Sequence, residues 1–365
     1  MRAINELSSR INQHLGWDKR RIDCFCKMMV ALVMVQSINL KKLACAILGD
    51  AQRDSSYRRL QRFFSGFRMN YDNVAKLLVR LFSLGSSSRY LILDRTNWKW
   101  GQSDINILFL CVAYRGVAIP IFWLVLNKRG NSSTRERIAL VQRFISVFGV
   151  NWIAGILGDR EFIGKHWFSY LDNQKIVYYF RIKKDANTTN KNGKCIDVSW
   201  LFHGLALNQP RILTQKKPIY GHNVYLAGML IENDYLIIAT NQPADDAIKI
   251  YAQRWQIETL FGCLKSKGFN FEDTRVINRD RIKKMIAVLA IAFCWAHITG
   301  EWSHRHEKPI KLKKHGRLQE SYFRRGLDDI KEMLFKGGRK VSKLIRIFRQ
   351  CFDQHPQMSL GSGNL

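Results

Sequence analysis

Long apolar runs are missing from the sequence, and with them the usual mark of a membrane-spanning chain. The best apolar stretch, Met285 to Ala296, is too short to cross a bilayer and is flanked by Lys283, Lys284 and His297. We therefore expect a buried helix there and no membrane partner. Residues 1–21 are polar and amphipathic without an apolar signal core, which argues against export and favours the cytoplasm.

Paired cysteine spacings and a phosphate-binding glycine loop are also missing. The eight cysteines are scattered, and the gap between Cys24 and Cys26 is shorter than the two-residue spacing of a zinc knuckle. We expect free thiols in a reducing compartment. From Gly158 to Lys165 the glycine spacing is one residue too long for a phosphate loop, and no Ser or Thr follows the lysine. Nucleotide hydrolysis is therefore excluded.

Acidic residues are scarce relative to basic ones. The chain has 29 Asp and Glu against 59 Lys and Arg, a formal net charge of +30. Such an excess opposes compaction unless a polyanion offsets it, and nucleic acid is the natural partner. The basic residues extend from Lys19 to Arg349 rather than forming one tail. With 365 residues, 47% of them hydrophobic, the chain can fill a sizeable core in two domains or in one catalytic domain with helical additions.

Residues 1–88 are helical and basic, which predicts a DNA-binding domain. The runs INLKKLACAIL and SSYRRLQRFFSGF, on either side of Gly49, could form two helices joined by a tight turn. The second helix would carry Arg58, Arg59 and Arg62. These arginines either contact DNA or solvate an outer face, and the sequence favours neither interpretation.

Residues 89–186 change to a strand-rich pattern that predicts a catalytic core. Three adjacent strands are expected first, followed by a helix, a strand, a helix and a strand. This is the element order of the ribonuclease-H-like fold, an α/β fold with a mixed sheet. The expected elements are strands at 90–96, 105–114 and 117–125, a helix at 134–148, a strand at 152–157, a helix at 164–173 and a strand at 176–182.

The rest of the chain completes this core after an interruption. Residues 187–241 contain short apolar runs separated by Asn, Gly and Pro, which we interpret as an inserted β-rich subdomain. Residues 242–300 return to helix, at 244–267 and again at 281–299, and form the second part of the catalytic core. Residues 301–365 are a basic C-terminal region in which two further helices are expected.

The sequence YAQRWQIETLFGCLK contains one polar stripe. Four polar residues fall at offsets of 0, 3, 7 and 14, within an arc of about 60° on a helix. They are Tyr251, Arg254, Glu258 and Lys265. Apolar residues occupy the adjacent arc and would bury that side of the helix. A carboxylate can ligate a metal, while Arg, Lys and Tyr side chains can bind phosphate. The alternative is a solvated helix face.

Two further carboxylates follow hydrophobic strands. Asp94 closes the run YLILD and Asp159 follows WIAGILG, where a lone carboxylate has poor reason to lie unless it binds something. With Glu258 they come from three separate elements that can converge. Hard cations prefer oxygen ligands, so the three acids predict a site for two Mg²⁺ ions, with Mn²⁺ as a substitute, suited to phosphodiester displacement.

Taken together, these residues resemble the DDE transposases of bacterial insertion sequences that carry the YREK signature. This is insertion-sequence family four, of the transposon-five and transposon-ten type. Its signature is Tyr, two residues, Arg, three residues, Glu, six residues, Lys, which residues 251–265 fit throughout. LILDRTNWKWG around Asp94 and ILGDREF around Asp159 resemble the family's two aspartate regions. Their spacings are 65 residues (159 minus 94) and 99 residues (258 minus 159).

The resemblance implies cut-and-paste DNA transposition in the bacterial cytoplasm, in association with the nucleoid. Its substrates are the terminal inverted repeats of the transposon and target DNA, both double-stranded, and the enzyme works as a dimer in the synaptic complex. By resemblance, Tyr251, Arg254 and Lys265 would grip phosphates near the cleaved end. Arg181, in the run FRIKK, would contact the terminal DNA.

Two other functions stay open. One is a ribonuclease-H-like nuclease or resolvase that cleaves DNA without joining it. The other is a catalytically silent DNA-binding protein derived from a transposase. A further acid, Glu161, lies two residues after Asp159, and we predict that it forms a structural ion pair with the adjacent Arg160.

Overall fold

The structure, a computed structural model, divides the chain into two compact units. One unit is Ser86–Phe261, and the other combines Met1–Gly85 with Gly262–Leu365. The residues that the structure describes are 2–49, 51–85, 87–232, 234–314 and 316–353.

The sheet of the unit Ser86–Phe261 begins with an antiparallel meander. β1 (Arg89–Trp100) pairs with β2 (Ser103–Tyr114), and β2 pairs with β3 (Val117–Leu126). β4 (Ile153–Gly158) and β5 (Tyr178–Arg181) follow on the other side of β1 and run parallel to it. The strands are rich in β-branched and aromatic residues, which suit a pleated and buried surface.

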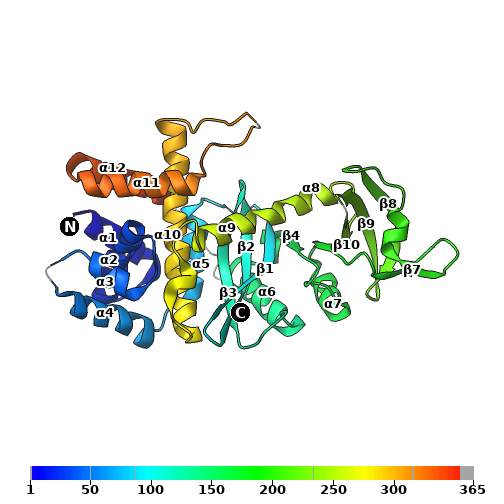
Figure 1. Cartoon of the computed structure of the whole chain (residues 1–365), viewed down its shortest axis with the longest axis horizontal. Coiled ribbons are helices and arrows are strands. Elements are labelled where there is room, and N and C mark those ends of the chain that lie inside the picture. The colour runs from blue at the N-terminus through cyan, green and yellow to red at the C-terminus, as the bar shows by residue number, and fades with distance from the viewer. Residues whose placement is uncertain (1, 50, 86, 233, 315, 354–365) are drawn as a thin grey trace, which may run out of the picture. The chain divides into compact units, whose positions relative to one another are not determined.

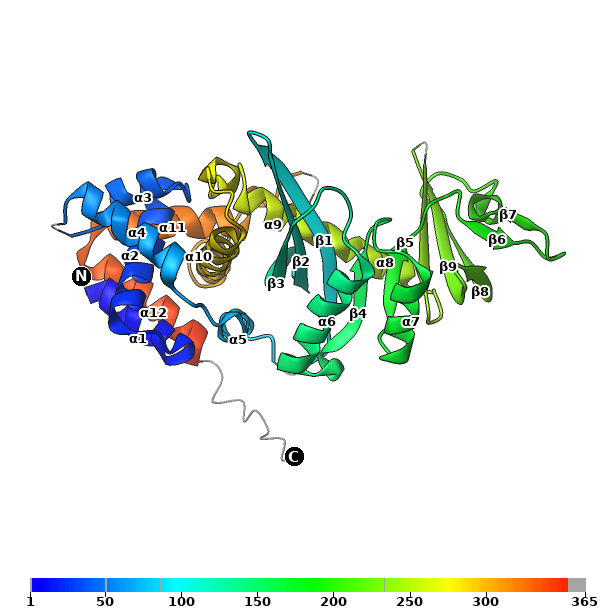
Figure 2. The same ribbon diagram turned by 90° about the horizontal axis from the view of Figure 1, so that it is seen from below.

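Two helices cover one face of this sheet, as Figure 2 shows. They are α6 (Thr134–Phe148) and α7 (Lys165–Asn173). The Phe122 ring of β3 packs edge-on against Phe144 of α6, and the Phe180 ring of β5 stacks on Phe168 of α7. Large aromatic side chains from the sheet therefore anchor both helices.

A broken helix lies over the opposite face of the sheet. It consists of α8 (Ala247–Ala252), the 3₁₀ turn η3 (Gln253–Trp255) and α9 (Gln256–Leu264). Phe261 of α9 contacts Phe109 of β2, with ring centroids 5.4 Å apart. Leu110, the next residue of β2, pairs with Phe122, so Phe109 and Phe122 point to opposite faces. The single helix expected at 244–267 is thus interrupted by one tighter turn.

Three strands of the segment expected as an insertion extend the same sheet. β10 (Asp234–Thr240) pairs antiparallel with β5, and β9 (His222–Ile231) and β8 (Pro210–Ile219) follow outward. The sheet has eight strands in the order β3-β2-β1-β4-β5-β10-β9-β8 (Figure 1). A small second sheet and a 3₁₀ turn complete the segment, namely β6 (Asn187–Thr189), β7 (Cys195–Asp197) and η2 (Val198–Phe202).

The strand order β3-β2-β1-β4-β5, with the first three strands antiparallel and the last two parallel to β1, is the ribonuclease-H-like arrangement. The predicted α/β fold with a mixed sheet and additional helices at both ends is therefore confirmed. Strand patterns in a sequence locate strands but not their partners, which is why β8 to β10 were not expected in this sheet.

The other unit is helical in its described residues and joins segments from both ends of the chain (Figure 1). Its centre is α10, which packs against α2, α4, α5, α11 and α12. The elements are α1 (Arg2–Leu15), α2 (Lys19–Val35), α3 (Leu40–Ala46), α4 (Arg53–Gly66), α5 (Tyr71–Leu81), η4 (Phe271–Thr274), α10 (Arg279–His306), α11 (Tyr322–Lys336) and α12 (Gly338–Asp353).

The helix expected at 281–299 is α10, and its predicted burial is confirmed. It is the one described single helix that is long and apolar enough to cross a membrane, and 94% of its apolar window is buried, as in a core helix. α10 meets α11 at two glycines. A side chain on Gly300 would clash with the carbonyl of Tyr322, and one on Gly326 would clash with the carbonyl of Ala296. The two backbones therefore approach each other closely.

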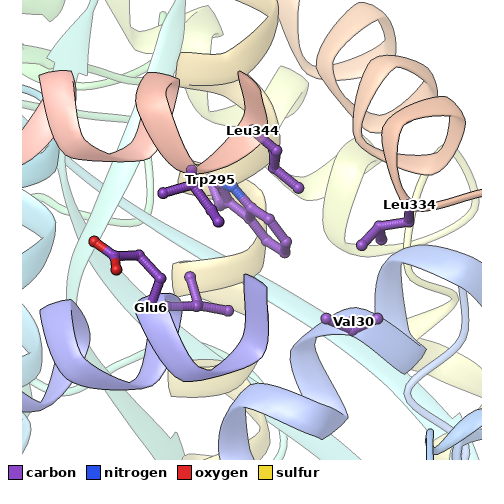
Figure 3. Close-up of a pocket in the computed structure, with 7 residues that line it drawn as sticks. Glu6, Val30, Trp295, Leu334 and Leu344 are labelled. Carbon is purple, nitrogen blue, oxygen red and sulfur yellow. The ribbon is translucent and has the colours of Figure 1, made fainter. Parts of the chain in front are cut away.

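A small cavity lies between helices of this unit (Figure 3). Its lining is apolar except for one carboxylate and comprises Glu6, Leu7, Val30, Trp295, Leu334, Leu344 and Ile345. Its volume of about 20 Å³ corresponds to roughly one water molecule. The cavity is therefore a packing gap and too small for an organic ligand.

Candidate active site

The ends of three neighbouring parallel strands bring predicted site residues together. Leu93 of β1 pairs with Gly158 of β4, and Gly158 pairs with Phe180 of β5. Neighbouring strands are about 4.8 Å apart, and paired residues point to the same face. The residues that follow on the three strands are therefore neighbours on the α8–α9 face, namely Asp94, Asp159 and Arg181.

The local sequence explains how the two aspartates come to point the same way. Consecutive residues of a strand face opposite sides, so Asp94 faces α8 and α9 while Leu93 is buried below it. Gly158 provides room beneath Asp159, because a Cβ atom there would lie 2.9 Å from the Phe180 ring and 3.0 Å from the Phe162 ring. The glycine lets those two rings pack under the strand end.

The guanidinium of Arg254 lies at the centre of the predicted site. One Nη donates to Asp94 at 2.9 Å and the other donates to Glu258 at 3.2 Å. The Arg254 side chain is only 7% exposed. It also lies over two aromatic rings, with its central carbon 4.8 Å from the Trp255 ring and 5.9 Å from the Tyr251 ring. Arg254 thus joins a strand-end acid to the acid of α9.

Burial and neighbouring charge control ionisation in this cluster. Burial raises the pKa of Asp94 to about 6, and nearby Asp159 adds to the rise, while Arg254 and the backbone N–H of Arg95 oppose it. Burial by itself lowers the pKa of Arg254, but Tyr251 and the three acids outweigh it, and the net shift is upward. Burial also raises the pKa of Tyr251, so its hydroxyl stays neutral and able to donate.

Asp94, Asp159 and Glu258 therefore all act electrostatically on one cation. Asp94 is largely buried, with a side chain 17% exposed, whereas the Glu258 side chain is 50% exposed. The backbone N–H of Arg160 donates to the Asp159 carboxylate at 2.6 Å, which orients that acid. Asp94 and Asp159 each accept a backbone N–H at a strand end, whereas Glu258 lies on α9 with half of its side chain exposed.

These acids fit hard divalent ions in chemistry, since Mg²⁺ and Mn²⁺ take oxygen ligands. In the part of the chain that the structure describes, however, no three His, Cys, Asp or Glu side chains are close enough together to hold a metal ion. The physical reason is visible in the ion pairs, because Arg254 separates Asp94 from Glu258.

The other predicted phosphate-binding residues are engaged in ion pairs. Arg181 donates to Asp234 at 2.9 Å, and its side chain is 14% exposed. Lys265 follows α9 and belongs to the helical unit, where its ammonium lies 2.8 Å from Glu272.

The structure corrects the predicted partner of Glu161. Both carboxylate oxygens of Glu161 accept from Nε of Arg95, at 3.1 and 3.3 Å, and Arg160 instead donates to Asp234 at 3.2 Å. Arg95 faces the α6 side of the sheet, opposite to Asp94. Arg137 of α6 is buried and donates to the Glu161 carbonyl, so this network braces the loop that carries Asp159.

Sequence reasoning missed Asp234 and gave Arg160 the wrong partner. Asp234 starts β10, which is 74 residues beyond Arg160 (234 minus 160), and no local pattern connects the two. No sequence pattern assigned a role to Trp255, although its ring is 56% exposed and lies beside Arg254. Trp200, in η2, is 65% exposed and stacks on His203.

Comparisons with known proteins identify a family for most of this region. Residues 85–295 match the family model described as the transposase DDE domain. These 211 residues (295 minus 85 plus one) are more than half of the 365-residue chain. No curated protein sequence matches the chain. Among solved structures, the piggyBac transposase in its synaptic complex with hairpin DNA is similar, at 11% identity over 99% of this chain and 84% of that chain, with a TM-score of 0.45.

Proposed function

Because the chain belongs to the transposase DDE domain family, we propose that it cleaves DNA at the ends of a transposable element and joins the freed 3′ hydroxyl to target DNA. The observation that supports this most is the placement of Asp94 and Asp159 at adjacent strand ends with Glu258 facing them through Arg254. Carboxylates brought together from separate elements are what a two-metal site for phosphodiester cleavage needs.

The proposed cofactors are two Mg²⁺ ions, or Mn²⁺ in their place, held by Asp94, Asp159 and Glu258. When bound, such ions activate a water or hydroxyl and neutralise charge on the leaving oxygen. Arg254 has to give up at least one carboxylate for this to happen, since its guanidinium now holds two. Glu258 is the more exposed partner, and we infer that it is the one released.

The residues of the signature would then bind the DNA end. A guanidinium released by a carboxylate presents two parallel donors, which match a phosphate. The neutral Tyr251 hydroxyl is a further donor close to Arg254. Lys265 would supply a point charge from the end of α9. The full YREK pattern is the reason to assign the chain to insertion-sequence family four, of the transposon-five and transposon-ten type.

The proposed partners are the terminal inverted repeats of the element and a target duplex, bound by a dimer in the synaptic complex. The charge of +30 supports this, because binding to DNA phosphates offsets the self-repulsion of the protein. The inverted repeats should be readable in the DNA that flanks the coding region. That DNA supplies the substrate for every test below.

Asp159→Asn tests the proposed site. The substitution keeps the size of the side chain but removes the charge that would hold a metal, so we expect Mg²⁺-dependent cleavage of the terminal repeat to be lost. Binding to the same DNA should remain within a few-fold of wild type, because the guanidiniums are untouched. Cleavage is measured with end-labelled DNA and binding by fluorescence anisotropy. Equal cleavage by wild type and Asp159→Asn would contradict the proposal.

Two other functions give different results in these assays. A ribonuclease-H-like nuclease or resolvase would cleave the terminal repeat without producing joined molecules. A silent DNA-binding protein derived from a transposase would bind the repeat and cleave nothing with either metal. The presence of all three acids favours the enzyme over the silent protein.

A further inference from the structure

Two arginines beside the predicted acids share a single carboxylate oxygen. Oδ2 of Asp234 accepts from Arg181 at 2.9 Å and from Arg160 at 3.2 Å. The other oxygen of Asp234 accepts the backbone N–H of Tyr235 at 2.8 Å. One negative charge therefore faces two positive ones, and the cluster keeps a net charge of +1.

Arg160 and Arg181 also have N–H donors that Asp234 does not use. Each guanidinium carries five N–H donors. Arg181 uses one Nη for Asp234 and for the carbonyl of Tyr235, whereas its Nε–H is buried and has no partner in the described part of the chain. The Arg160 side chain is 41% exposed. A tetrahedral anion with several acceptor oxygens would satisfy these donors better than one carboxylate oxygen does.

The position of the cluster identifies the anion. Arg160 directly follows Asp159, and Arg181 directly follows Phe180, which pairs with Gly158, the residue before Asp159. Arg181 also acts electrostatically on Tyr251. An anion bound here would lie next to the reacting phosphate, so a neighbouring phosphate of the same DNA is the ligand that fits.

We propose that Arg160 and Arg181 form a second phosphate-binding site, which holds a DNA backbone phosphate beside the catalytic acids. Asp234 occupies the donors of this site until DNA arrives. The inference rests on the proposed function and adds Arg160 and Asp234 to it. In the alternative, the three residues only tie the start of β10 to β4 and β5, and DNA binding does not depend on their charge.

The test is DNA binding in EDTA, where cleavage cannot occur, over a series of salt concentrations. The probe is a duplex that carries the terminal repeat. Arg160→Ala should weaken binding by about tenfold. It should also reduce the slope of log K against log salt by about 0.9, which corresponds to one lost phosphate contact. Arg160→Lys should keep the slope, because it keeps the charge.

Two variants control for general effects. Arg135→Ala removes an exposed arginine from the start of α6, on the opposite face of the sheet, and should leave both quantities unchanged. Asp234→Asn frees both arginines, so the slope should be at least as steep as in wild type. Thermal melting shows whether each variant is folded.

The inference is overturned if folded Arg160→Ala binds DNA like Arg135→Ala, or if folded Arg160→Lys shows the same reduced slope as Arg160→Ala. It is also overturned if Asp234→Asn lowers the slope. Failure of wild type to bind any terminal repeat would overturn the proposed function itself, and with it this second site. The two failures are therefore distinguishable.

Discussion

Arg254 has a different partner in this structure from the one that the signature implies. The sequence assigns it to a DNA phosphate, whereas here its guanidinium bridges Asp94 and Glu258. Electrostatics accounts for the contact with Asp94, because a largely buried carboxylate is stabilised by a cation beside it. Under the proposed function, Arg254 and the metal ions would compete for these carboxylates.

Arg254→Ala tests this substitution of one cation for another. Removing a positive charge beside Asp94, Asp159 and Glu258 should raise their affinity for Mn²⁺ in the absence of DNA by at least about tenfold. Mn²⁺ binding is measured by electron paramagnetic resonance, with Arg135→Ala as the control. Unchanged or weaker Mn²⁺ binding would show that Arg254 does not compete with metal.

At the residue scale, the sequence indicates the positions of some side chains and gives no sign of other contacts. Glu258 follows from helix geometry and from the signature, and the register of β1 and β4 sets Asp94 beside Asp159. Arg160 and Asp234 could not be paired in advance. Their contact spans 74 residues (234 minus 160), and it exists only because the sheet brings β10 next to β5.

His297 makes the stability of the helical unit depend on pH. It lies inside α10, 4% exposed, and burial lowers its pKa to about 3 from the usual 6.5. The unfolded chain takes up a proton below pH 6.5 while the folded chain resists it until about pH 3. Stability is therefore lost as pH falls through this range, by up to about 1.4 kcal/mol for each pH unit.

His297→Phe should remove this dependence, since phenylalanine binds no proton. The free energy of unfolding is measured by chemical denaturation between pH 7 and pH 4. We expect the difference in stability between wild type and variant to shift steadily in favour of the variant as pH falls. A constant difference across the range would contradict a neutral buried histidine.

At the scale of elements, β4 depends on its glycines to carry Asp159. A methyl group on Gly158 would press on the Phe180 and Phe162 rings at 2.9 and 3.0 Å, whereas one on Gly155 would meet Tyr90 and Tyr179 at 3.2 and 3.3 Å. The tighter site lies directly before the acid. A side chain at Gly158 should therefore lower the free energy of unfolding and also displace Asp159.

We expect Gly158→Ala to lower the free energy of unfolding by about 1–3 kcal/mol and to reduce cleavage more than this loss explains. Gly155→Ala is the matched control, three residues away on the same strand, with a smaller expected effect on both quantities. Denaturation curves measure the loss of stability. Cleavage rates, measured below the unfolding range, measure the separate effect on activity. If both alanines behave alike, the close packing under Asp159 has no special role.

The periodicity of the sequence predicts most helices and strands, but it does not predict how the strands pair. The helix at 134–148 has the same limits in the structure, because apolar spacing and the cap residue Ser133 both mark its start. The apolar runs of residues 187–241 predict a β-rich segment, but they do not show that β8 to β10 join the main sheet. Edge pairing depends on backbone groups that every residue has, so a side-chain pattern does not specify it.

For the whole molecule, long-range packing decides the division into units. The segments expected as separate domains at 1–88 and 301–365 contribute to one helical unit, because α10 packs against helices from both. Arg58 and Arg62 of α4 are exposed in this unit, while Arg59 is tied to Asp23 at 2.8 Å. Two of the three arginines considered for DNA contact therefore remain available for it.

Joining DNA as well as cutting it is what distinguishes a transposase from a nuclease. A strand-transfer assay with pre-cut terminal repeats, a plasmid target and Mg²⁺ measures joining directly and bypasses the cleavage step. We predict joined molecules with wild type and none with Asp94→Asn, Asp159→Asn or Glu258→Gln. Cleavage of uncut ends by wild type without any joined product from pre-cut ends would contradict transposition and identify the protein as a nuclease.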